Sequence, residues 1–101
     1  MASREELHEI LKGLLGSDWV YYQPPESTKM NYTAIRYSLS DIRSTFSNDK
    51  RYSLIPCYEL IVIARKPNDP VIAKILELPY SSYVRHYVAD NLNHDVIRLY
   101  F

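Results

Sequence analysis

The run YSLIPCYELIVIA at positions 52–64 constrains the fold of this chain more than any other segment. It is the most strand-like stretch, and it ends in a β-branched block typical of a strand near the centre of a sheet. Pro56 has no amide hydrogen for a neighbouring strand, so the residues around it are predicted at an edge or a bulge. The rest of the chain must supply the strands and helices that cover this run.

Four other segments have strand character: DWVYYQ at 18–23, YTAIRYSLSDI at 32–42, SYVRHYVA at 82–89 and DVIRLYF at 95–101. The polar residues SNDKR at 47–51 predict a hairpin tip or a longer arm. The residues DNLNH at 90–94 predict a five-residue connection between the last two strands. We expect structural roles in this turn for Asp90, Asn91, Asn93 and His94.

Two helices are predicted from their caps and apolar stripes. Ser3 and Glu6 form a capping box, and a stripe of apolar residues follows at helical spacing: Leu7, Ile10, Leu11 and Leu14. The glycines at 13 and 16 stop this helix. In the second helix Asp69 is the cap, Pro70 takes the first position, and Pro79 ends it. The expected order is α-β-β-β-α-β-β, a single α+β domain over residues 1–101 with a mostly antiparallel sheet and both helices packed against it.

Composition narrows the classes of function. The chain has 12 basic and 12 acidic side chains, which argues against a one-signed field that steers it toward free nucleic acid or a membrane. The single cysteine, Cys57, excludes an internal disulfide and a multi-cysteine zinc site, and it is expected to be a small apolar filler. Ten tyrosines and two glycines suit a pleated surface that contacts other proteins.

Candidate catalytic residues are few. His86, His94 and Asp90 are the residues that a small metal-dependent hydrolase or nuclease would use, but their spacing matches no strong metal motif. The simpler alternative is that His94 and the asparagines bond to the turn backbone. His8 is expected to be solvated on the first helix. We therefore predict a protein that is not an enzyme and takes no cofactor.

Basic and aromatic residues raise two further alternatives. Arg43, Lys50 and Arg51 bracket the predicted arm, either as a solvated tip or as one presented to an acidic partner or to nucleic acid moving past. The tyrosines at 80, 83 and 87, with Arg85, could form a base-stacking platform. Half-buried sheet aromatics explain the same pattern, and the neutral net charge favours that explanation.

The motifs YTAIRY, NDKRY, YELIVIARKPNDP, AKILELP and YVADNLNHDVIRLYF, in this order over residues 32–101, resemble those of the small tail terminator, or tail completion, proteins of long-tailed bacteriophages. Thr33 stands where the family pattern suggests a proline. The resemblance implies a ring, usually of six copies, at the head-proximal end of the tail tube, with no catalytic residue. Its implied partners are further copies, the tail tube protein and a head-side neck protein.

This resemblance places the protein in the virion after assembly in the host cytoplasm, with DNA passing through the ring without stable binding. The alternative within the same class is a head-side connector or stopper of the neck. We expect an interface between subunits or partners to include Tyr83, Tyr87, Leu99, Tyr100 and Phe101, with a place in the sheet itself as the alternative for the last three. We also expect the arm with Arg43, Lys50 and Arg51 to face the opening or the adjoining ring.

Overall fold

The computed structural model describes the backbone of residues 3–47 and 50–101 and the side chains of residues 3–42 and 55–101. Its elements are α1 (Arg4–Leu15), β1 (Val20–Tyr22), β2 (Ala34–Ser47), β3 (Lys50–Ala64), α2 (Pro70–Leu76), β4 (Ser81–Ala89) and β5 (Leu92–Tyr100). This order and the α+β class confirm the predictions. No helix in the described ranges is long and apolar enough to cross a membrane.

The five strands form one sheet in the order β1-β2-β3-β5-β4. The long run predicted near the sheet centre is β3, which pairs with β2 on one side and β5 on the other. Neighbouring strands are antiparallel except β1 and β2, which are parallel. A parallel pair needs a long connection, and the loop over residues 23–33 provides it.

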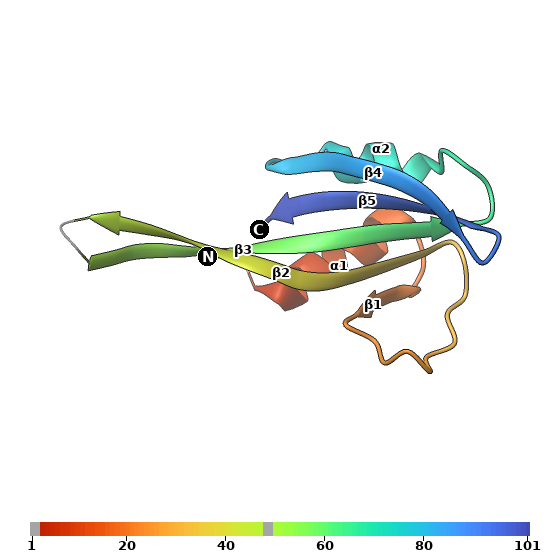
Figure 1. The fold of residues 1–101 in the computed structure, drawn as a ribbon, viewed down its shortest axis with the longest axis horizontal. Coiled ribbons are helices and arrows are strands. Elements are labelled where there is room, and N and C mark those ends of the chain that lie inside the picture. Colours follow the sequence, from red (N-terminus) through yellow and green to blue (C-terminus); the bar gives the residue numbers. More distant parts are fainter. Residues whose placement is uncertain (1–2, 48–49) are drawn as a thin grey trace.

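The hairpin of β2 and β3 extends beyond the other strands as an arm (Figure 1). Pairing of β3 with β5 stops at Cys57, which lies opposite Tyr100, and the amide of Phe101 then donates to the carbonyl of Pro56 at 3.1 Å. Pro56 therefore lies where β3 loses its second neighbour. This is the edge position predicted for Pro56. A residue without an amide hydrogen is tolerated there, because no strand on that side needs its donor.

Both helices begin at their predicted caps. Ser3 Oγ accepts from the amide of Glu6 at 3.2 Å, and Asp69 Oδ1 accepts from the amide of Val71 at 3.0 Å. The first helix runs through Gly13 and ends at Gly16, whose φ of 80° is the left-handed conformation that glycine adopts without strain.

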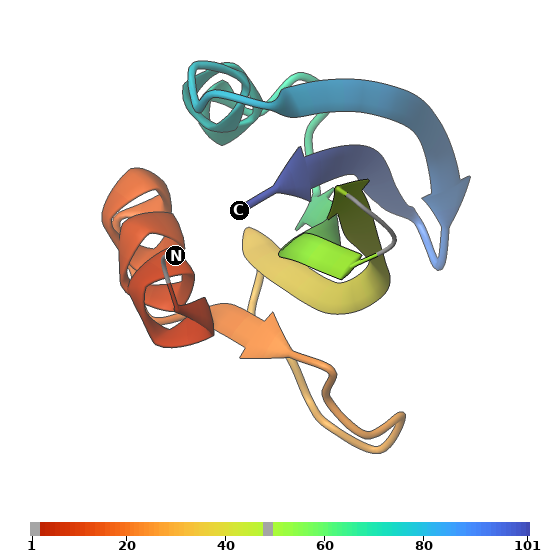
Figure 2. The same ribbon diagram turned by 90° about the vertical axis from the view of Figure 1, so that its left-hand side faces the viewer.

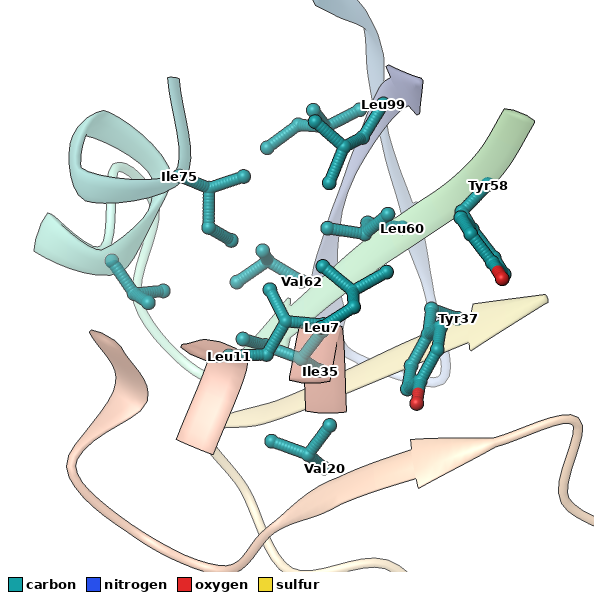
Figure 3. Packing of buried hydrophobic residues seen from close by; sticks show 12 residues of the cluster. Leu7, Leu11, Val20, Ile35, Tyr37, Tyr58, Leu60, Val62, Ile75 and Leu99 are labelled. Atoms are coloured by element: carbon teal, nitrogen blue, oxygen red, sulfur yellow. The ribbon is translucent and has the colours of Figure 1, made fainter. Parts of the chain in front are cut away.

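The two helices lie on the same side of the sheet, as Figure 2 shows. Their buried side chains pack with alternate residues of β2, β3 and β5 into the core drawn in Figure 3. This core includes Leu7, Leu11, Ile35, Tyr37, Leu60, Val62, Ile75, Ile97 and Leu99. The residues between these in each strand point to the opposite side, which we call the helix-free face.

The turn between β4 and β5 is shorter than predicted. Only Asp90 and Asn91 lie between the strands, both with positive φ (53° and 61°), whereas Asn93 and His94 belong to β5. Two successive left-handed residues match the right-handed twist of the flanking strands, and Asp and Asn tolerate that conformation better than most residues. The five-residue connection is therefore corrected to a two-residue turn.

Candidate interaction surfaces

The sheet has two different open edges. β4 (Ser81–Ala89) pairs on one side with β5, and its other side pairs with no described strand. β2 (Ala34–Ser47) is covered by β1 only at Ile35, Arg36 and Tyr37. Beyond this point Gln23 Oε1 accepts from the amide of Leu39 at 3.1 Å, and the edge of β2 that follows is open toward the arm.

Exposed apolar side chains gather along these two edges. Near and on β4 lie Tyr80 with 81% of its surface exposed, Val88 with 63%, Tyr83 with 46% and Val84 with 43%. On β2, at the base of the arm, Leu39 is 39% exposed and Ile42 is 47% exposed. An unpaired strand edge with apolar side chains is a surface on which another strand can pair.

The two edges are compatible in direction. Because β2–β3, β3–β5 and β5–β4 are all antiparallel pairs, β4 runs opposite to β2. A second copy that places its β2 beside β4 would therefore extend the sheet as another antiparallel pair. The contact would join two different surfaces of the same chain, which is the head-to-tail type that can close a ring.

The residues predicted at an interface lie in different environments. Leu99 is fully buried in the core of the subunit, so the expected place in the sheet holds for it and the interface does not. Tyr100 and Phe101 are half-buried and line an apolar pocket of about 440 Å³ with Ile55, Tyr80 and neighbouring residues. The amide of Tyr100 donates to the carbonyl of Tyr80 at 3.1 Å. The last residues of the chain are thus docked in the sheet.

Tyr83 and Tyr87 lie on opposite faces of the sheet. An alternating strand would place both on one face, but the register shifts between Tyr83 and Arg85, leaving Val84 as a bulge. Tyr83 therefore faces α2 (Pro70–Leu76), and its hydroxyl donates to Asp95 Oδ1 at 2.6 Å. Tyr87 lies on the helix-free face and stacks on His94, with 4.7 Å between ring centroids. A platform that uses both tyrosines is excluded by this geometry.

The structure does not bring His86 and His94 together on one face. His86 Nε2 lies 3.0 Å from Asn93 Oδ1, and His94 Nδ1 lies 3.0 Å from the carbonyl of Leu92. Among the described residues, no group of three His, Cys, Asp or Glu side chains could hold a metal ion. The hydrolase alternative therefore finds no support in these positions. His94 contacts the backbone, as the simpler alternative expected, but at Leu92 of β5 rather than in the turn.

His8 is half-buried against the sheet, contrary to the expectation of a solvated residue. Its Nδ1 lies 2.7 Å from Tyr37 Oη, which also accepts from Arg4 Nη1 at 3.4 Å. The guanidinium of Arg4 lies 4.4 Å from the ring centre of Tyr22. Burial, and then the positive charges of Lys12 and Arg4, lower the pKa of His8, while burial raises the pKa of Tyr37. The sequence signal for this cluster is the place of Arg4 and His8, four residues apart on one helix face.

The side chains of Arg43, Lys50 and Arg51 lie outside the described residues, although their backbone belongs to β2 and β3. The prediction that they face an opening or a neighbouring ring therefore stays a prediction.

Comparison of the chain with protein-family models, with curated proteins and with solved structures finds no match.

Proposed function

We propose that this protein is a structural subunit of a bacteriophage tail terminator, which assembles head-to-tail into a ring at the head-proximal end of the tail tube. The observation that carries the proposal is the pair of complementary open edges, β4 and the outer part of β2, at opposite sides of one sheet. The resemblance of the motifs over residues 32–101 to that family supplies the biological setting.

A ring subunit needs two different flanks, and these edges can serve as them. Pairing of β4 with β2 of the next copy would satisfy backbone groups along both strands and cover Val88, Val84 and Ile42. Repetition of the same contact with a fixed rotation closes the ring, as strands close a barrel. Since both helices lie on one side of the sheet, they would all lie on one side of the ring wall, and the helix-free faces on the other.

The arm gives the ring a way to contact what lies above or below it. It extends along the long axis of the subunit, whose extents are 50 × 24 × 24 Å. In the proposed ring, the arm with Arg43, Lys50 and Arg51 reaches the opening or the adjoining ring. Covering the last ring of tail tube protein would stop tube growth and leave a surface for the head-side neck protein.

The proposal is tested by the mass of the purified chain in solution and on isolated tail tubes, measured by light scattering with particle images of the same samples. Val88→Lys on β4 and Ile42→Lys on β2 place a charge on each edge, and we expect either variant to reduce the ring to monomers. Ile10→Lys is the matched control, because Ile10 is 37% exposed on α1 (Arg4–Leu15) and belongs to neither strand edge. Its ring should persist.

A chain that stays monomeric both alone and with tail tubes would overturn the ring. The same preparations distinguish a tail terminator from the alternative, a head-side connector of the neck. A terminator is found on isolated tails, whereas a connector is found on tailless heads.

A further inference from the structure

The helix-free face of the sheet carries three exposed arginines. Arg36 on β2 and Arg98 on β5 each lie between two core residues and so point to the opposite side of the sheet, and Arg85 on β4 lies opposite Val96, which also points to that side. The strand registers place Arg36, Ile61, Val96 and Arg85 in one row across the sheet, with Arg98 two residues along β5 from Val96. At about 4.8 Å per strand, the two ends of this row lie roughly 14 Å apart.

Among the residues whose side chains the structure describes, no carboxylate forms an ion pair with these guanidinium groups. The ion pairs of the described residues are Arg4–Glu5, Lys12–Glu9 and Lys12–Asp18, all at or near α1. Glu59, half-buried opposite Arg98 in the register, shares the face with them but pairs with none within 4.0 Å. Asp41 lies on the same face nearer the arm, where its Oδ1 accepts from the amide of Ile42 at 2.8 Å.

An aromatic ring contacts Arg85, and a second tyrosine is the register neighbour of Arg36. The guanidinium carbon of Arg85 lies 5.5 Å from the ring centre of Tyr87, which stacks on His94 with 14° between the rings. Tyr21 of β1 lies opposite Arg36 in the register. A guanidinium held against an aromatic ring loses less side-chain freedom when it binds, and its planar group suits phosphate oxygens.

We propose that the helix-free face binds the phosphate backbone of duplex DNA through Arg36, Arg85 and Arg98, without sequence preference. The row spans roughly 14 Å, close to the ~12 Å width of the DNA major groove, so its two ends reach phosphates on both sides of a groove. This inference goes beyond the ring, because one subunit carries the whole surface. In a ring with this face inward, the surface would line the opening through which DNA moves.

The test measures binding of the full chain to a fluorescent DNA duplex by anisotropy, from low to moderate salt. Three phosphate contacts predict that log K falls with log salt with a slope of about −2.7. Each of the variants Arg36→Gln, Arg85→Gln and Arg98→Gln should reduce the magnitude of this slope by about 0.9. Lys74→Gln is the control, since Lys74 is exposed on α2 (Pro70–Leu76), which lies on the other side of the sheet, and this variant should bind as the original chain does.

A triple variant that stays folded and binds DNA with unchanged affinity would overturn the inference, as would no binding by the original chain at low salt. Binding to polyglutamate without binding to DNA would also overturn it, in favour of an acidic protein partner. The mass of each sample shows whether the ring forms, so that failure of DNA binding can be distinguished from failure of the proposed ring. A monomer that binds DNA through these arginines supports the inference while counting against the ring, and a ring that does not bind DNA does the reverse.

Discussion

At the scale of single residues, the cluster of His8, Tyr37, Arg4 and Tyr22 holds α1 (Arg4–Leu15) against the sheet. Tyr37 is nearly completely buried, and its hydroxyl keeps two partners from the helix. A buried hydroxyl without partners is costly, so the two helix residues stabilise the position of this tyrosine. The neutral form of His8 suits the arrangement, because its Nδ1 can accept a hydrogen bond from the hydroxyl of Tyr37 while Arg4 donates one to the same hydroxyl oxygen.

This cluster predicts a pH dependence of stability. The pKa of His8 is lowered in the folded chain, so below pH 6.5 the unfolded chain takes up its proton first. The contribution of His8 is present above its ordinary pKa and is lost as the pH falls through 6.5 toward the folded value. Urea unfolding at several pH values should show a larger loss for the original chain than for His8→Gln. An identical pH profile for both would contradict the prediction.

At the scale of elements, β5 (Leu92–Tyr100) connects the core to the end of the chain. Its residues Ile97 and Leu99 are fully buried under the helices, and the strand pairs with β3 and β4 on its two sides. The chain therefore ends in an interior strand, and its last side chains are held by packing rather than left to fray.

Leu99→Ala tests the importance of this strand. The substitution leaves a cavity in the core, and we expect a loss of about 2–5 kcal/mol in the free energy of unfolding, measured by urea denaturation. Val88→Ala, at a side chain with 63% exposure on β4, is the control and should change the free energy of unfolding by less than about 0.5 kcal/mol.

Deleting residues 99–101 should abolish the folded protein. A truncated chain that folds with normal stability would show that this strand end is dispensable.

At the scale of the whole molecule, the sheet presents different edges to its two sides and different faces to the helices and to solvent. In the proposed ring, such a subunit would have a direction around the ring as well as an inside and an outside. The proposed head-to-tail contact joins β4 to β2, whereas a symmetric dimer would join β4 to β4 or β2 to β2.

Crosslinking distinguishes these two modes. Val88→Cys and Ile42→Cys place one reactive thiol on each edge, while Cys57 is buried and should not react. With a short bis-maleimide, each variant alone should form few dimers, and their equimolar mixture should form many. Efficient crosslinking of either variant with itself would favour the symmetric contact instead.

Much of the fold could be predicted from local signals. The caps at Ser3 and Asp69, the left-handed glycine at Gly16 and the alternation in β2 act within a few residues, so they are readable in the sequence. The candidate surfaces were harder to predict from the sequence. The bulge at Val84 reverses which side of the sheet the residues after it face, and no local signal fixed its position.

The amino-acid sequence by itself determined the order of helices and strands, because hydrophobic period, capping and turn chemistry are local properties of the chain. Only the tertiary structure decided that Leu99 lies in the core, that Tyr83 and Tyr87 lie on opposite faces of the sheet, and that three arginines share one face. These depend on register and on which neighbour a strand acquires. Such pairings join residues far apart in the chain, and a single shift of one residue exchanges the two faces of a strand.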